Sequence, residues 1–153
     1  CSGNVAIRLH SHGVPKKLGF RIPAWSKQTT VQLGADIYHP EPGRYFILER
    51  VWDDTLHIAF DFTPRLLKGE MEYAGQSSVY VGPILYAWDR AANAALPFDE
   101  LPPLFFTEIL AAAPERLPDG RILLRLAGGP ILTDFYHTGL SGCEYKTWLP
   151  VRE

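Results

Sequence analysis

The stretch LHIAFDF at residues 56–62 alternates large apolar side chains with polar or small ones. Successive side chains of a β-strand point to opposite faces, so such a run gives one face to a core and the other to solvent. The same period of two recurs at residues 5–10, 17–22 and 29–33. Alternation with one buried face is typical of antiparallel sheets, and it predicts a strand in each of these segments.

Turn-forming residues separate the predicted strands. The sequences GVP at 13–15, GAD at 34–36, PEPG at 40–43 and DD at 53–54 each lie between two of them. Short strands with such regular punctuation indicate a sandwich or a barrel. We therefore expect an all-β fold, an antiparallel two-sheet β-sandwich of the jelly-roll-like kind, in a single domain of residues 1–153.

Two segments, residues 44–52 and 78–88, are more continuously apolar or aromatic and are predicted to lie centrally in their sheets. Pro83 has no backbone N–H to donate, so it should lie at a bulge or at a sheet edge. Alternation and apolar continuity together predict a shared core, made of Phe20, Ile22, Val31, Ile47, Ile58, Phe60, Val81 and Leu85.

The pattern changes over residues 91–119, which carry five prolines. We expect one long Pro-rich excursion over the sandwich surface, with a short helix within residues 104–113. Strand-like sequence returns at 121–126, 131–135 and 145–149.

The amino-acid composition restricts the kinds of partner that the protein can bind. Hydrophobic residues make up 46% and charged residues 21% of the chain, and the net charge is -2. The basic residues are scattered, with Lys16-Lys17 the only adjacent pair, and this pattern argues against nucleic acid or an anionic membrane surface as a partner. No apolar run reaches the roughly 18 residues of a membrane helix. We expect a soluble protein, either cytoplasmic or secreted.

The two cysteines, Cys1 and Cys143, allow at most one disulfide, which is not a disulfide framework. The chain begins with Cys1 rather than Met. One interpretation is a lipoprotein processed before Cys1, but strand-like sequence starts without a flexible tether. An excised fragment of a larger protein is the favoured interpretation.

Residues 18–25 read LGFRIPAW, residues 43–52 contain GRYF and RVW, and residues 79–87 read VYVGPILYA. In this order they resemble three motifs of the C-terminal β-sandwich region of glycoside hydrolase family 127. This is the β-L-arabinofuranosidase-type family, formerly a domain of unknown function. The motifs are L-x-L-R-I-P-x-W, G-Y-x-x-[IL]-x-R-x-W and V-A-[VL]-x-x-G-P-L-V-Y-A. Residues 132–148 also resemble the closing strands of the family.

Two turns depart from the family pattern. LGAD at 33–36 stands where the family often has Asn-Gly, and WDD at 52–54 stands where it has W-x-x-G-D. Both departures keep residues that are compatible with turns, so they affect turn geometry rather than the fold.

The resemblance also implies what the chain does. Family members hydrolyse glycosides in an (α/α)6 barrel that precedes this region, with a zinc-bound cysteine as nucleophile and a glutamate as acid/base. Neither CSG at 1–3 nor Cys143 matches the cysteine-rich motif of that site. The resemblance therefore implies a non-catalytic accessory domain that packs against the missing barrel of the same polypeptide. It implies no cofactor in this chain, with zinc belonging to the catalytic domain.

The tryptophans are candidate contact residues, for a sugar or for another domain. An aromatic face can pack on a sugar ring, although aromatic side chains more often fill a core. An alternative function is therefore a carbohydrate-binding module with an exposed aromatic platform. The four candidates are Trp25, Trp52, Trp88 and Trp148.

Two further patterns carry chemistry, but neither leads us to assign a catalytic or metal residue. His10-x-His12 could place two imidazoles on one face of a strand, as in a metal-dependent β-barrel enzyme, but zinc needs a third ligand. Asp134, His137 and Ser141 have the residue types of a hydrolytic triad without the Gly-x-Ser-x-Gly context.

A domain that packs against a barrel should have one unusually apolar surface. Such a patch could lead to self-association of the isolated chain. The expected contributors are Leu101, Leu104, Phe105, Phe106 and Trp25.

Overall fold

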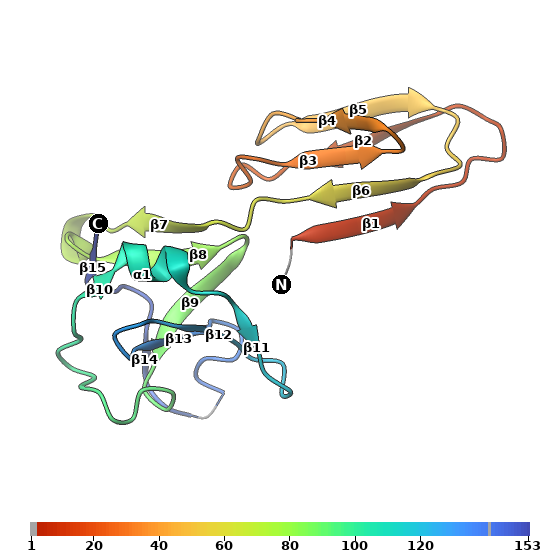
Figure 1. The fold of residues 1–153 in the computed structure, drawn as a ribbon. Coiled ribbons are helices and arrows are strands. Elements are labelled where there is room, and N and C mark those ends of the chain that lie inside the picture. The colour runs from red at the N-terminus through yellow and green to blue at the C-terminus, as the bar shows by residue number, and fades with distance from the viewer. Residues whose placement is uncertain (1–2, 141) are drawn as a thin grey trace. The chain divides into compact units, whose positions relative to one another are not determined.

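The computed structural model describes residues 3–140 and 142–153. Strands make up 41% and helix 6% of the chain, and almost all strand pairs are antiparallel, which confirms the predicted all-β sandwich class (Figure 1). The chain divides into two compact units, residues 3–62 (the N-terminal unit) and residues 63–153 (the C-terminal unit). That residues 1–153 act as a single domain stays a prediction.

The N-terminal unit consists of two antiparallel sheets. One has the strand order β1-β6-β3-β4 and the other pairs β2 with β5. The expected turns at 13–15, 40–43 and 53–54 lie between strands, as do the first two residues of the turn expected at 34–36, whose Asp36 begins β4. The strands are β1 (Asn4–Arg8), β2 (Lys16–Arg21), β3 (Thr30–Leu33), β4 (Asp36–Tyr38), β5 (Tyr45–Arg50) and β6 (Thr55–Ala59).

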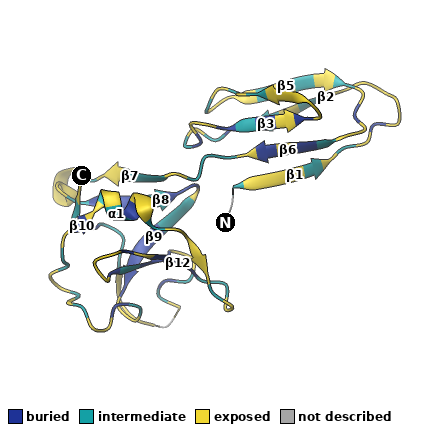
Figure 2. Cartoon of the chain, viewed as in Figure 1, coloured by how far each residue is buried: buried dark blue, intermediate teal, exposed yellow. Residues whose placement is uncertain are grey.

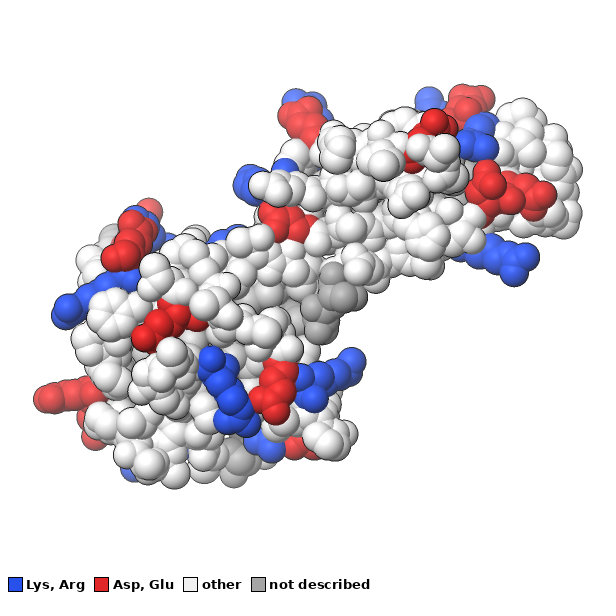
Figure 3. Space-filling view, in the orientation of Figure 1, with Lys and Arg blue, Asp and Glu red and all other residues white. Residues whose placement is uncertain are grey.

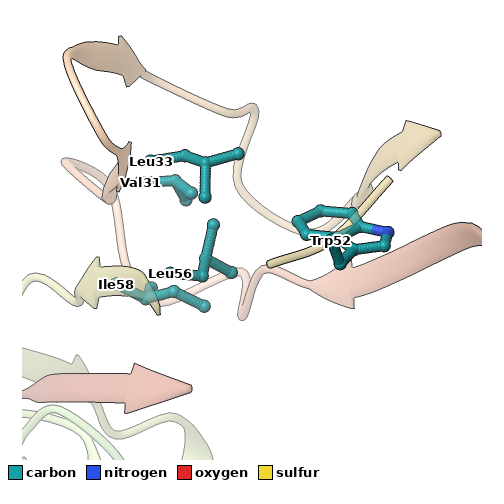
Figure 4. Packing of buried hydrophobic residues seen from close by; sticks show 5 residues of the cluster. All are labelled: Val31, Leu33, Trp52, Leu56 and Ile58. Carbon is teal, nitrogen blue, oxygen red and sulfur yellow. The ribbon is translucent and has the colours of Figure 1, made fainter. Parts of the chain in front are cut away.

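The two sheets of this unit share a core, as in a sandwich. The apolar side chains of β3 and β6 point inward beside the buried ring of Trp52 (Figure 4). Leu18 and Phe20 of β2 and Phe46 and Leu48 of β5 pack against this group from the other sheet. Every second side chain of these strands therefore lies in the core, as the period of two in the sequence predicts. The fully buried members are Val31, Leu33, Trp52, Leu56 and Ile58.

The C-terminal unit is built on a seven-stranded sheet with the order β11-β12-β13-β9-β8-β7, in which β14 also pairs with β9. A two-stranded parallel sheet joins β10 to β15. The strands are β7 (Pro64–Lys68), β8 (Ser77–Val81), β9 (Ile84–Asp89), β10 (Leu104–Phe105), β11 (Glu115–Arg116), β12 (Ile122–Arg125), β13 (Ile131–Asp134), β14 (Tyr145–Lys146) and β15 (Val151–Arg152).

Residues 78–88 lie centrally, as the sequence predicts, in the form of the hairpin β8–β9. Val81 pairs with Ile84, so Gly82 and Pro83 are the two turn residues. Gly82 has φ +56°, which suits glycine at the first central position of a type II′ turn. The expectation that Pro83 lies at a bulge or an edge was wrong. Pro83 lies in a tight turn, where a residue without a backbone N–H is also tolerated.

The prediction for residues 44–52 was wrong. Strand β5 pairs only with β2 in a two-stranded sheet, and exposed and half-buried residues alternate along it. Ile47, predicted to be in the core, is 53% exposed on the outer face. Of the other predicted core residues, Ile22, Val31, Ile58 and Val81 are buried, and Phe20, Phe60 and Leu85 are half-buried.

The Pro-rich excursion contains the predicted short helix, α1 (Phe106–Ala111), between β10 and β11. Ile109 of this helix is fully buried. Leu104 is also buried, so it does not contribute to an apolar surface as expected, whereas Phe105 is 46% exposed. No helix in the described part of the chain is long and apolar enough to cross a membrane.

Candidate functional site

Two of the four candidate tryptophans are buried and two are half-buried, and each unit contains one of each kind. Trp52 and Trp88 are 1% and 0% exposed. Trp25 and Trp148 are half-buried. A platform for a sugar or another domain must be accessible, so Trp52 and Trp88 are core residues and do not belong to the candidate site.

Trp52 is held on all sides in the N-terminal unit. Its Nε1–H donates to the carbonyl oxygen of Lys16 at 2.7 Å, and its backbone N–H donates to Ser11 Oγ at 2.8 Å. The ring of Phe20 lies edge-on to its own ring at 6.2 Å. This arrangement satisfies the polar end of the indole and buries the rest, which is a structural role.

Trp88 lies in β9 at the middle of the seven-stranded sheet, opposite Leu132 of β13 and Lys146 of β14. Its Nε1–H is buried and has no hydrogen-bond partner. Trp25 lies against Phe60 and Phe62, with ring centroids 6.0 and 5.7 Å away. Trp25 therefore covers one end of the N-terminal core while keeping part of its surface accessible.

Trp148 lines the candidate functional site, a cavity of about 510 Å³ in the C-terminal unit. Tyr73, from the short 3-10 helix η1 (Met71–Tyr73), stacks on Trp148 with centroids 4.9 Å apart and ring planes 17° from parallel. The remaining lining residues are Gln76, Asp99, Leu101, Tyr145, Lys146, Thr147 and Pro150. The sequence analysis found Trp148, and it named Leu101 only as part of an apolar surface. It missed the other lining residues, because Tyr73, Gln76 and Asp99 come from distant segments and the residues that flank Trp148 carry no motif.

The predicted His10 and His12 lie just beyond the end of β1, in a turn. The Nδ1–H of His10 donates to Asp53 Oδ1 at 2.6 Å, and the rings of His10 and His12 contact edge-on at 4.3 Å. Within residues 3–140 and 142–153, no three His, Cys, Asp or Glu side chains come together as metal ligands.

Asp134 and His137 do come together in the C-terminal unit, whereas Ser141 lies outside the described residues. The Nδ1–H of His137 donates to the buried Asp134 carboxylate, 2.7 Å from Oδ1. Asp134 Oδ2 also accepts the backbone N–H of Ile122 at 2.7 Å. The carboxylate thus connects β12, β13 and the following turn, and its oxygens are occupied by structural donors.

The charged residues on one face of the described chain do not gather into a patch. On the face shown in Figure 3, Lys and Arg lie close to Asp and Glu in small groups, and neither sign covers a continuous patch there. Several groups are exposed ion pairs, such as Arg125 with Glu115 at 2.6 Å and Arg121 with Asp119 at 2.8 Å. Exposed pairs of this kind contribute little free energy.

Comparison with known proteins relates the fold to glycoside hydrolases. The sequence matches no protein-family model and no curated protein. Among solved structures, 99% of the chain superposes on a glycoside hydrolase with a TM-score of 0.79 and 18% identity, covering 31% of that protein. A GH127 β-L-arabinofuranosidase from Geobacillus stearothermophilus T6 matches 99% of the chain with a TM-score of 0.77 and 18% identity, over 29% of its length.

A third solved structure, a GH127 β-arabinofuranosidase, matches 99% of the chain with a TM-score of 0.74 and 17% identity, over 30% of its length. The chain therefore spans less than a third of the structures that it resembles. The resemblance to family 127 that the sequence motifs indicate is confirmed at the level of the fold.

Proposed function

We propose that the chain is a non-catalytic accessory β domain of a larger glycoside hydrolase of the β-L-arabinofuranosidase type. In this proposal it packs against a helical catalytic barrel elsewhere in the same polypeptide. One observation carries the proposal: nearly the whole chain, 99%, matches a part of three glycoside hydrolases that makes up only 31%, 29% and 30% of their lengths.

Two carboxylates beside a second cavity of the C-terminal unit, Asp89 and Asp119, are poorly suited to acid catalysis, which supports a non-catalytic role for this cavity. The cavity, of about 320 Å³, is lined by Asp89, Asp119, Arg121 and His137 among others. Glycoside cleavage needs a carboxylic acid whose pKa is raised so that it can donate a proton. The pKa of Asp119 is instead lowered, mainly by the backbone N–H of Arg121 and further by the Arg121 guanidinium. Asp89 is buried, and its Oδ1 accepts the backbone N–H of Ala91 at 2.8 Å.

The outer face of the β2–β5 sheet supports packing against another domain. Tyr45 is 64% and Ile47 53% exposed on this face, and Gly19 opposite Ile47 leaves their side chains uncovered. Beyond this apolar centre, Lys17 and Glu49 form a cross-strand pair of opposite charge. An apolar centre with a polar rim is typical of a surface that contacts another protein surface.

The direct test is hydrolysis by the isolated chain. We expect no release of p-nitrophenol from p-nitrophenyl β-L-arabinofuranoside above a buffer blank, with or without added zinc, because the lowered pKa makes Asp119 a poor proton donor and Asp89 is held by the backbone N–H of Ala91. The control is the His137→Ala variant, which should give the same blank rate. Turnover that His137→Ala abolishes would show that the chain has its own active site.

The packing face has its own test. Without a barrel, we expect a second copy to cover the β2–β5 face, so the mass in solution should rise with concentration. The Ile47→Lys variant should stay monomeric across the same series, while Leu67→Lys, an equally exposed position on β7, should behave like the unchanged protein. A strictly monomeric protein would count against an apolar docking face and favour an independent binding module.

A further inference from the structure

The Trp148 cavity is formed by three segments of the C-terminal unit. Residues 73–76 contribute Tyr73 and Gln76, residues 99–101 contribute Asp99 and Leu101, and residues 145–150 contribute Trp148 and its neighbours. Its volume of about 510 Å³ lies in the range of small-molecule sites, roughly 300–1,000 Å³.

Backbone hydrogen bonds hold the first and third segments together. Ser77 and Leu149 exchange both of their backbone hydrogen bonds, at 2.9 and 3.0 Å. Ser78 Oγ–H donates to the carbonyl oxygen of Thr147 at 3.0 Å. The side chain of Trp148 therefore extends from a backbone fixed on both sides, and a ligand would not need to order it.

Lys146 joins the second segment to the third. Its ammonium group donates to the carbonyl oxygens of Phe98 at 2.7 Å and Asp99 at 3.1 Å. The same Nζ lies 4.8 Å from the centroid of the Phe98 ring, within the range of a cation–π interaction. Lys146 thus positions Asp99 at the cavity with most of its donors already used.

The two walls of the cavity differ in chemistry. Tyr73 and Trp148 lie face to face, so the stack offers a ligand the flat apolar outer face of a ring rather than the two rings side by side. Gln76 offers an amide that both donates and accepts, and the exposed carboxylate of Asp99 accepts. A sugar ring has the complementary character, because one face exposes C–H groups while hydroxyls project from its edge. Aromatic residues with polar tips suit ligands of this mixed kind.

The charges at the cavity favour a neutral ligand. The opposite charges of Asp99 and Lys146 lie at the same cavity and offset each other, so an ion of either sign gains no net attraction from this pair. The hydroxyl groups of a neutral ligand suit the polar wall of the cavity, since a hydroxyl can donate to the Asp99 carboxylate and accept from the Gln76 amide.

We propose that this cavity binds a ring of a neutral saccharide, with the C–H face of the ring on the Tyr73–Trp148 stack and its hydroxyls on Asp99 and Gln76. This site does not depend on packing against a catalytic barrel, and a chain that fails to hydrolyse glycosides can still bind one.

The test is affinity electrophoresis of the whole chain in gels that contain one soluble polysaccharide each. The neutral probes are arabinan, xylan, galactomannan and hydroxyethylcellulose, and the charged probes are polygalacturonate and chitosan. We expect retardation by at least one neutral probe. The apparent dissociation constant for that probe should rise about tenfold or more in Trp148→Ala and Tyr73→Ala, as at other binding sites where an aromatic contact is removed.

Matched controls separate binding from folding. Trp25→Ala removes the other half-buried tryptophan, Tyr136→Ala removes a tyrosine that is 80% exposed, and Asp36→Asn changes an exposed carboxylate on β4. All three should bind as the unchanged protein does, while Asp99→Asn should bind more weakly. Because Tyr73 and Asp99 are exposed, their variants keep the test valid if Trp148→Ala does not fold.

Three results would overturn the proposal. They are no retardation by any neutral probe, retardation by the charged probes only, or neutral binding that Tyr73→Ala and Asp99→Asn leave unchanged.

Discussion

The two units bury their strands in different ways. In the N-terminal unit, exposed and half-buried positions alternate along β5, and buried positions alternate with accessible ones along β6. In the C-terminal unit, β9, β12 and β13 each have at least three consecutive buried residues. Figure 2 shows the contrast between β6 and β9. One-sided burial produces a period of two in the sequence, whereas strands enclosed on both faces are continuously apolar.

Buried polar side chains, in contrast, act alike in the two units. In the N-terminal unit, Ser26 Oγ lies 2.6 Å from Thr29 Oγ1 and accepts the backbone N–H of Asp61 at 2.8 Å. In the C-terminal unit, Asn93 and Asp134 reach across from turns or strand ends to neighbouring strands. Both units therefore use buried polar side chains to join segments that are far apart along the chain.

The largest expected effect is on the N-terminal core. Replacing Trp52 with Ala removes a ring that is 1% exposed and leaves a cavity, so the free energy of unfolding should fall by about 3–5 kcal/mol. Urea unfolding followed by circular dichroism measures it. Ile37→Ala on β4, where Ile37 is 59% exposed, should change little and serves as the control.

The same variant tests whether the units unfold together. In a Trp25→Phe background, Trp52→Ala leaves Trp88 and Trp148 as the two remaining tryptophans. If residues 1–153 form a single cooperative domain, Trp52→Ala in this background should shift their fluorescence transition as much as the circular dichroism transition. An unshifted transition for these two tryptophans would show two independent units.

The next effect concerns buried polar bonding in the C-terminal unit. Asn93 is 4% exposed, its Nδ2 donates to the carbonyl oxygens of Asp89 and Ile131, and its Oδ1 accepts the backbone N–H of Ile131. Asn93→Ala leaves buried backbone groups without partners, which should cost about 2–3 kcal/mol. Asn4→Ala on the exposed strand β1 should cost under about 0.5 kcal/mol. Equal small losses at both positions would contradict the bonding role of Asn93.

A smaller effect appears at high pH through Tyr86, which is 1% exposed in β9. Burial raises its pKa above the ordinary value, and the Asp134 carboxylate raises it further. The folded chain then holds a proton that the unfolded chain loses above about pH 10. Stability should therefore fall as pH rises beyond 10, by at most about 1.4 kcal/mol per pH unit from this group.

The Tyr86→Phe variant isolates that contribution. The difference in stability between the unchanged protein and Tyr86→Phe should be constant below pH 9 and should shift in favour of the variant above pH 10. A difference that stays constant up to pH 11 would mean that Tyr86 ionises as readily in the folded chain as in the unfolded one.

Much of the fold could be predicted because alternation and turn residues are local signals. Eight of the nine strand segments that the sequence indicated contain a single strand, and residues 78–88 contain the hairpin β8–β9. Strands β4, β7, β10, β11 and β15 were missed for physical reasons. β10, β11 and β15 have two residues each, which is too short to show a period. β4 has only three residues, and β7 begins at Pro64 and carries Leu66 and Leu67 side by side, without alternation.

The candidate site could be predicted only in part. Residue type alone selects four tryptophans, but accessibility depends on which strand lies opposite, and this is not a local property. The hairpin and sheet around β9 bury Trp88, while the contact with Tyr73 places Trp148 at a cavity. Gln76 and Asp99 reach that cavity through tertiary structure, so no spacing in the sequence indicated them. Lys146 lies two residues before Trp148, but its contacts with Phe98 and Asp99 are not visible in the sequence.

The smallest expected effect tests the outer face of β5, where the sequence placed Ile47 in the core. Alternation alone does not say which row of a strand points inward, and here Phe46 and Leu48 take the inner row. Ile47→Thr keeps a β-branched side chain and removes apolar surface that is already exposed, so stability should change by less than about 0.5 kcal/mol in dilute protein.

The matched variant is Val31→Thr on β3, where the side chain is 0% exposed. It buries a hydroxyl in the apolar core and should cost about 1–3 kcal/mol. Both variants place threonine on a strand, so strand propensity cancels and the difference between them measures burial. A loss above 1 kcal/mol for Ile47→Thr in dilute protein would mean that the β2–β5 face is covered within the chain. The face could then no longer serve as a docking surface for another domain.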